Sequence, residues 1–399
     1  MKQDHIFRMP ALYCILTLLL FTASACAVHG LSPTETASQY HPIRLASGVP
    51  SAPGSVAWSP DGKMIAWIGK QLTVYNRESG KRTSFPMSNP RFVAWSPDGL
   101  LYILNRDANG DVFLSTLDVN HSRVSVLASV EADAVFVFPD GKSLVLVSAP
   151  FKQLSIGTQI NTRIVVYSVG SNTSRTVYRQ SRTSMTKNLD TTLWTAWLHA
   201  GVNQLDLALL VMEHVTPPLL ASYTVVNTLD PATGELTPLT ASDSRRRYFS
   251  GSWSPNGKRV ALTDADGRLE IRSRPGDSIV LDPSVISVYP SWNPQGSRLY
   301  AGGFLVDSAG TNKKQLLEAA QRSIGTWSPD GTMLIVAGDS ELLLFTGIPT
   351  TFIPPDTPAN KASVERFSLL RSLVLDGSIS REEYRERRNR LLEKTGEAQ

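Results

Sequence analysis

The sequence predicts an all-β fold, a β-propeller of four-stranded antiparallel blades, followed by a small pair of helices. The main observation is a five-residue repeat, Trp-Ser-Pro-Asp-Gly, at residues 58–62, 95–99 and 327–331, with looser copies at 138–141, 253–257 and 292–296. Apolar runs flank the copies, so each copy is a hairpin turn. Proline fixes the first corner, aspartate bonds back to the backbone, and glycine supplies the positive φ angle.

Strands fill the space between these turns. In the first repeat, we expect strands at residues 55–58, 64–68, 71–76 and 82–85, which is one propeller blade. An eroded copy, with a strand at 195–198, a turn at Gly201 and a strand at 205–211, fills the long gap before residue 253. Counting this copy gives seven blades, and leaving it out gives six. Residues 43–46 would supply the outer strand of the last blade and close the ring.

The N-terminus has the features of an export signal. Lys2 and Arg8 precede an apolar run at residues 11–21, and small residues follow. The string Ala23-Ser24-Ala25-Cys26 resembles a bacterial lipobox, with Ala23 where leucine is usual. We therefore expect residues 1–25 to be a lipoprotein-type signal peptide and Cys26 to carry the lipid. Ordinary signal cleavage and an uncleaved anchor are the alternatives.

The rest of the chain divides by composition. Residues 26–42 are a polar tether, residues 43–347 the propeller, and residues 348–360 a proline-rich linker. Residues 361–399 are a helical hairpin, because apolar residues recur at helical spacing, Asp376-Gly377 interrupts the pattern, and Ser380 with Glu383 forms a capping box. The predicted location is the bacterial cell envelope, lipid-anchored, with the propeller in the periplasm or extracytoplasmic space.

Two parts of the chain resemble known families. The repeats between residues 56 and 346 resemble the WD-like propeller repeats of the TolB family and of the propellers attached to prolyl oligopeptidases. The C-terminal hairpin is similar to the SHOCT module, and this resemblance implies oligomerisation or docking. The residues expected to mediate it are Leu370, Leu373, Ile379, Tyr384 and Leu391. The alternative is a hairpin that simply packs on the propeller.

Searches for catalytic motifs find none, so we expect a protein that is not an enzyme and has no cofactor. No Gly-x-Ser-x-Gly elbow is present, and the aspartate turns differ from the Ser-x-Asp-x-Gly-x-Thr-Trp pattern of sialidases. The histidines share no ligand spacing for a metal. Residues 105–111 resemble the front of a calcium loop, but Thr116 stands where the closing glutamate belongs, so a plain turn is preferred there and at 264–267.

The formal net charge is +4, with a pI of about 9.0, which is too mild to predict nucleic-acid binding. Basic residues nevertheless gather with long predicted loops at 148–161, 179–192 and 213–220, which we place on one propeller face. The candidate partner-binding residues are Lys152, Arg179, Arg182, Lys187, Arg245, Arg246 and Arg247. Solvated loop charge is the alternative interpretation of this cluster.

The predicted function is a non-enzymatic binding scaffold of the cell envelope. Its partners would be an envelope protein or an anionic envelope polymer, the membrane through the N-terminal lipid, and a second copy through the hairpin. The alternative is a glycan-binding or polysaccharide-acting propeller of the lyase or hydrolase type.

Overall fold

The computed structural model describes residues 40–396 apart from the gaps given next. The gaps are 150, 155–156, 185–200, 204–205, 216–222, 240–247, 256, 258, 274–277, 281–284, 286, 288, 311–312, 319–321, 339–340 and 350–357. The chain divides into two compact units, Met1–Gln39 and Tyr40–Gln399, and only the second contains described residues. The signal, the tether up to residue 39 and Cys26 lie outside the described part.

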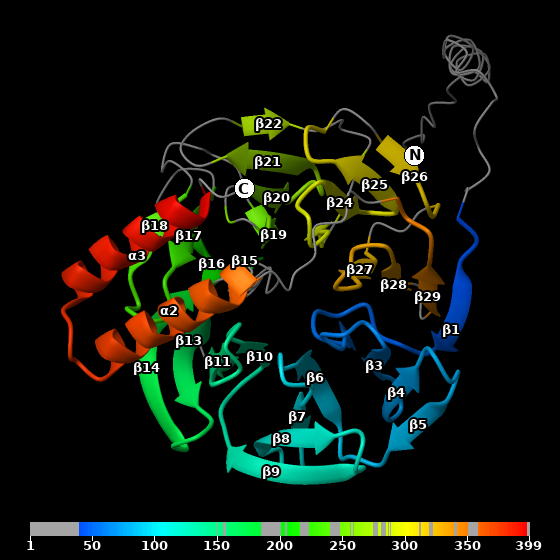
Figure 1. Ribbon diagram of the computed structural model, residues 1–399, viewed down its shortest axis with the longest axis horizontal. Helices are drawn as coiled ribbons and strands as arrows, with labels where there is room; N and C mark the ends of the chain where they lie inside the picture. Colours follow the sequence, from blue (N-terminus) through cyan, green and yellow to red (C-terminus); the bar gives the residue numbers. More distant parts are fainter. Residues whose placement is uncertain are drawn as a thin grey trace, which may run out of the picture. The chain divides into compact units, whose positions relative to one another are not determined.

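Small antiparallel sheets are arranged in a ring (Figure 1), which confirms the predicted propeller architecture. The first sheet contains β2 (Val56–Trp58), β3 (Met64–Ile68), β4 (Leu72–Asn76) and β5 (Arg82–Phe85). The second contains β6 (Pro90–Trp95), β7 (Leu101–Arg106), β8 (Val112–Asp118) and β9 (Arg123–Ser129). The third contains β10 (Ala134–Val137), β11 (Ser143–Ser148), β12 (Phe151–Leu154), β13 (Gly157–Ser168) and β14 (Thr173–Ser184).

The remaining sheets follow in chain order. The fourth contains β15 (Gly201–Asn203), β16 (Asp206–Val215), β17 (Tyr223–Leu229) and β18 (Leu236–Pro238). The fifth contains β19 (Tyr248–Trp253), β20 (Arg259–Asp264), β21 (Leu269–Ser273) and β22 (Ser278–Val280). The sixth contains β23 (Ser291–Trp292), β24 (Arg298–Ala301), β25 (Phe304–Asp307) and β26 (Lys313–Gln315).

The last sheet joins the two ends of the propeller. It contains β27 (Ile324–Trp327), β28 (Leu334–Gly338) and β29 (Glu341–Phe345), and β1 (Ile43–Ser47) pairs antiparallel with β29. Leu45 of β1 is buried in a core cluster with Trp58 and Leu342, so burial as well as strand pairing holds this closure. The predicted outer strand at residues 43–46 is confirmed.

The eroded repeat corresponds to the fourth sheet, although its register differs from the prediction. Its first strand, β15, begins at Gly201, where the sequence analysis places the turn, and residues 195–198 lie outside the described part. β15 pairs directly with β16, with Asn203 opposite Asp206. Counted with this sheet the ring has seven blades, and the other six sheets carry the motif turns.

The motif tryptophans tie neighbouring blades together. In four of these tryptophans the indole Nε1 donates a hydrogen bond to a backbone carbonyl on the innermost strand of the preceding blade, which satisfies a buried donor and an inner-strand acceptor at once. The pairs are Trp95 to Ala57 at 3.3 Å, Trp292 to Ser252 at 3.0 Å, Trp327 to Ser291 at 3.0 Å, and Trp58 to Thr326 at 2.9 Å. The Trp58 bond joins the first blade to the last and so completes the ring.

The serine and aspartate of the motif hold its turn. In the last blade, Ser328 Oγ donates to Asp330 Oδ1 at 2.5 Å, and the backbone N–H of Met333 donates to Ser328 Oγ at 2.9 Å. Burial alone would raise the pKa of Asp330, but the hydrogen bonds from Ser328 and Thr332 outweigh burial, so the pKa lies below its ordinary value. The aspartates of these turns therefore serve the fold.

Two helices follow the last blade, α2 (Pro358–Leu375) and α3 (Arg381–Gly396). Helix α2 begins three residues before the expected start of the hairpin at residue 361, with Pro358 at the first helical position, where its missing N–H costs nothing. Gly377 has φ +83° and lies just after the end of α2, and the Glu383 N–H donates to Ser380 Oγ at 3.1 Å, as the predicted capping box requires. Among the described residues, no helix has the length and apolar character needed to cross a membrane.

The strands of the third blade are longer than the sequence analysis predicts. Residues 157–168 and 173–184 form β13 and β14, so parts of the expected loops at 148–161 and 179–192 are strand instead. Residues on β14 such as Thr173 and Ser181 are exposed and polar, so the sequence of this outer strand resembles that of a loop. As a result Arg179 and Arg182 lie on a strand.

Candidate ligand groove and the docked helical hairpin

A groove of about 1040 Å³ lies between the second and third blades. Because the strands are antiparallel, the β7–β8 turn and the connection from the second blade to the third lie on one side of the ring, which we call the loop face. The motif turns lie on the opposite side, which we call the turn face. The groove opens among the loop-face segments and continues along β13 and β14. Its polar lining includes Arg106, Asp111, Glu131, Asp133, Asn161, Arg163, Tyr167, Arg179 and Ser181.

Two arginines face each other in this groove. Arg163 on β13 and Arg179 on β14 are direct partners in the antiparallel register, and both line the groove. Like charges placed directly opposite destabilise a strand pair. Arg163 donates from Nε to Thr176 Oγ1 at 3.1 Å, and its nearest acidic partner, Glu131, lies 3.7 Å away with its side chain 79% exposed. A solvated pair of this kind compensates little of the repulsion.

A third arginine and three acids complete the charge pattern. Arg106 lines the groove from the second blade, and its buried Nε has no hydrogen-bond partner among the described residues. A buried donor without a partner costs free energy that a bound acceptor would restore. Asp133 accepts the Ala149 N–H at 2.9 Å, and Asp111 and Glu131 belong to the same lining. The groove can therefore accept an anionic group beside groups that donate hydrogen bonds.

Of the predicted basic rim, Arg179 is the residue whose side chain is described, and it lies in this groove. Lys152 and Arg182 have described strand backbone, on β12 and β14, but their side chains are not described. Lys187, Arg245, Arg246 and Arg247 lie outside the described residues. The structure thus adds Arg106 and Arg163 to Arg179 and leaves the wider rim a prediction.

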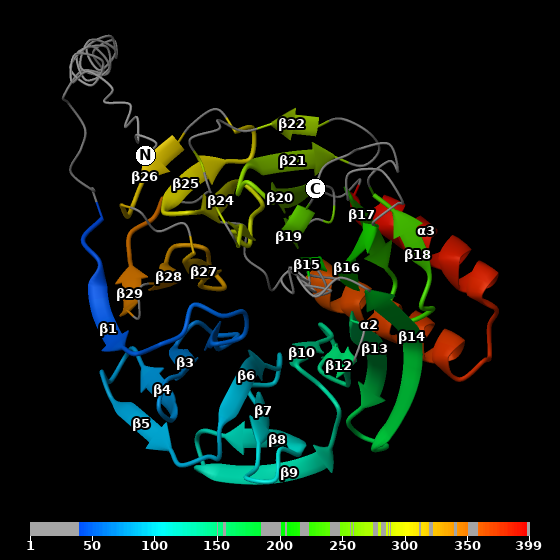
Figure 2. The same cartoon turned by 180° about the vertical axis from the view of Figure 1, so that it is seen from behind.

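The helical hairpin docks on the turn face, over the third and fourth blades. Figure 1 shows α2 and α3 lying across the strands of these blades, and in the reverse view of Figure 2 the strands lie in front of the helices. Leu370, Val374 and Tyr384 are buried in one cluster with Ala232 of the β17–β18 turn. Of the residues predicted to mediate oligomerisation or docking, Leu370 and Tyr384 therefore pack against the propeller of the same chain.

A buried ion pair fixes the hairpin to the third blade. Arg371 of α2 pairs with Asp140, and the two side chains are only 4% and 6% exposed. The Arg371 guanidinium also lies 3.9 Å from the ring centroid of Phe138. At the rim, Arg385 pairs with Glu235 at 2.8 Å in an exposed contact that contributes less.

The turn of the third blade is altered where Arg371 binds. The backbone bonds of Phe138, its N–H to Ser143 O and its carbonyl from Gly141 N–H, are those that Ser59 makes in the first blade. Phe138 therefore stands in the serine position of the motif. Without a serine hydroxyl, Asp140 keeps an oxygen for Arg371, while its Oδ1 still accepts the Lys142 N–H at 3.0 Å.

A buried ionic cluster lies between the fourth and fifth blades. Tyr248 donates to Glu270 at 2.7 Å, and Glu270 pairs with Arg272 Nε at 2.7 Å. Burial first, and then the hydrogen bond to Glu270, raise the pKa of Tyr248 to about 12. Tyr248 O also accepts a hydrogen bond from Thr224 of the fourth blade, so the cluster joins two blades.

The two turns weighed as calcium loops are held by their own aspartates. Asp107 Oδ1 accepts the N–H groups of Asn109 and Asp111, each at 2.9 Å. Asp264 Oδ1 accepts those of Asp266 and Arg268 in the same way. Throughout the described part of the chain, no group of three histidine, cysteine or acidic side chains is arranged to hold a metal ion.

Comparison with known proteins supports the fold. No protein-family model matches the chain, and a search of curated proteins finds no match. Among solved structures, an oligogalacturonate lyase in complex with manganese matches with a TM-score of 0.53 at 11% sequence identity, over 78% of this chain and 97% of that chain. At this identity the match shows a shared propeller fold alone, and the resemblances to the TolB family and the SHOCT module stay predictions.

Proposed function

We propose that the protein is a non-enzymatic binding scaffold and that the groove between the second and third blades holds an acidic stretch of a partner protein. The observation that carries the proposal is the direct pairing of Arg163 with Arg179 in that groove. A carboxylate between two guanidiniums turns their repulsion into two charge-assisted contacts.

The acids of the groove favour a protein segment over a uniformly anionic polymer. Asp111 and Glu131 lie in the same lining as the arginines and would repel a chain that carries a charge on every unit. A peptide carries its carboxylates at intervals and offers N–H donors between them. The groove volume, at the upper end of the roughly 300–1,000 Å³ of small-ligand sites, suits an extended segment.

Photo-crosslinking in cells tests this proposal. A photoreactive residue at Gln180, which lines the groove, should give a discrete protein adduct, whereas the same residue at the exposed Lys81 should not. Combining Gln180 labelling with Arg163→Glu or Arg179→Glu should abolish the adduct, while Arg123→Glu, an exposed arginine on β9, should leave it unchanged. An adduct that survives both groove substitutions would refute the proposal.

The second candidate is an acidic glycan as ligand or substrate. The similarity to an oligogalacturonate lyase structure favours it as far as a shared fold can. Isothermal titration with oligogalacturonate would detect binding, and a glycan mass on the Gln180 adduct would favour this candidate over the protein partner.

The proposed location is the bacterial envelope, with a lipid on Cys26. The support is the sequence of residues 1–26, with its basic start, apolar run and terminal cysteine. Cys26→Ala should release the protein from the membrane fraction, because acyl chains contribute about 0.8 kcal/mol per buried CH₂. Mass spectrometry of an unlipidated mature N-terminus would refute lipidation directly.

A further inference from the structure

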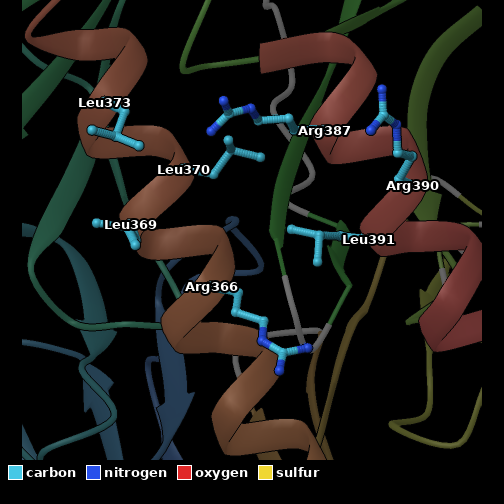
Figure 3. Close-up of a pocket in the computed structure, with 7 residues that line it drawn as sticks. All are labelled: Arg366, Leu369, Leu370, Leu373, Arg387, Arg390 and Leu391. Atoms are coloured by element: carbon cyan, nitrogen blue, oxygen red, sulfur yellow. The ribbon is translucent and has the colours of Figure 1, made fainter. Parts of the chain in front are cut away.

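A second, apolar groove lies between the two helices, on the side of the hairpin open to solvent. Its volume is about 290 Å³, and its lining consists of Leu369, Leu370, Leu373, Leu391, Arg366, Arg387 and Arg390. Figure 3 shows Leu370 of α2 and Leu391 of α3 pointing toward each other across it. We call it the hairpin groove.

Leu369, in the lining of the hairpin groove, is exposed to solvent. Leu369 is 62% exposed, although Leu370 beside it is buried against the propeller cluster. The propeller therefore already covers one face of α2, and the hairpin groove is a second apolar surface. Among the described residues, few large apolar side chains are this exposed, which makes it a candidate interaction site.

The charged side chains in the lining of the hairpin groove are three arginines. Arg387 and Arg390 each pair with a glutamate one turn earlier on α3, Glu383 and Glu386, in exposed contacts. Arg366 is exposed and forms no ion pair within the described part of the chain. In Figure 3 Arg366 extends from α2 toward α3, and Arg387 extends from α3 toward Leu370.

We infer that the hairpin groove binds an amphipathic helix of another protein, with acidic residues flanking its apolar anchors. The leucine floor suits the i, i+3 or i+4, i+7 side chains of such a helix. The arginine rim argues against a second copy of this chain as the occupant, since two hairpin grooves pressed together would bring arginine against arginine. Acidic residues beside the anchors would instead meet Arg366 and the two paired arginines.

The size of the hairpin groove limits the affinity. About 290 Å³ lies near the lower end of the roughly 300–1,000 Å³ of ligand sites, so it holds one or two anchor side chains. The complex is therefore a transient one, with charge contributing mostly to the association rate and to selectivity.

The test uses the purified full-length protein and two fluorescent helical peptides. Both peptides carry leucine at positions i, i+4 and i+7, one with glutamate and the other with lysine at the flanking positions. Fluorescence anisotropy should show the glutamate peptide binding at least tenfold more tightly than its lysine twin. Leu369→Glu should weaken the glutamate peptide at least tenfold, while Ser372→Glu, at an exposed position of α2 outside the lining, should change it less than twofold.

Three results would overturn the inference. The first is equal binding of both peptides. The second is binding that Leu369→Glu leaves unchanged while hydrogen exchange shows the hairpin still docked. The third is a dimer of the unmodified protein in sedimentation experiments that Leu369→Glu converts to a monomer, which would make a second copy the occupant.

Discussion

Replacing Arg371 by methionine should release the hairpin from the propeller without unfolding the propeller itself. The side chain of Arg371 is 4% exposed, and its loss leaves the buried carboxylate of Asp140 without its partner. Breaking a buried ion pair in this way costs about 3–5 kcal/mol. Because tenfold in an equilibrium constant corresponds to about 1.4 kcal/mol, the opening equilibrium of the hairpin should rise roughly 100- to 4000-fold.

Hydrogen exchange followed by mass spectrometry measures this opening directly. Peptides from α2 and α3 should exchange faster by that factor, up to the limit set by the undocked hairpin, whereas peptides from the first blade should exchange as in the unmodified protein. Arg366→Met is the matched control, since Arg366 lies on the same helix but is exposed.

A double variant separates the charge effect from lost packing. Arg371→Met combined with Asp140→Asn removes both charges, and the asparagine oxygen can still accept the Lys142 N–H that holds the turn. Most of the protection of α2 and α3 from hydrogen exchange should return, because the free-energy cost of the single variant comes mainly from an uncompensated buried charge. If Arg371→Met exchanges no faster than Arg366→Met, the ion pair does not hold the hairpin.

Three further outcomes follow from the ring and its buried cluster. Leu45→Ala should lower the free energy of unfolding by about 2–5 kcal/mol in urea titrations, since Leu45 is 2% exposed in the closing blade; a loss below about 0.5 kcal/mol would mean that β1 contributes little. Trp58→Phe should cost about 1–3 kcal/mol, because the Thr326 carbonyl loses its donor, and an unchanged thermal midpoint would contradict this. The pKa of Tyr248 is raised to about 12, so the stability that its neutral form provides is present below pH 10 and is lost as the pH rises through 12. In chemical unfolding experiments, Tyr248→Phe should therefore make the free energy of unfolding fall less steeply over this pH range. An equally steep fall in the variant would contradict the prediction.

Much of the fold was predictable because its determinants are local. Proline, aspartate and glycine fix the motif turns within five residues, and β1 was identified as the closing strand because the last blade lacked an outer one. The fourth blade was placed imperfectly because its motif turn is eroded. The extension of β14 was missed because an outer strand with polar residues on both faces has no alternation to detect.

The sites were harder to predict because they depend on register and long-range contacts. Arg163 and Arg179 are sixteen positions apart, and they become neighbours through a bulged pairing that the sequence does not reveal. In the sequence, Arg371 has no feature that distinguishes it from other helical arginines, because its role depends on the contact with Asp140 in the folded chain. One signal was available: the third motif copy lacks the serine, and Phe138 in its place marks that turn as different.

The pairing of β1 with β29 determines how the propeller would respond to mechanical tension. Ile43, at the start of β1, lies opposite Leu344, near the end of β29, so the two chain ends leave the pair at the same end. A force that separates these ends would break the β1–β29 hydrogen bonds one after another from that end, instead of loading all of them at the same time. Tension applied directly to the ends of this pair, at Ile43 and Phe345, would thus open the closing blade at low force and leave the interfaces between the other blades unloaded.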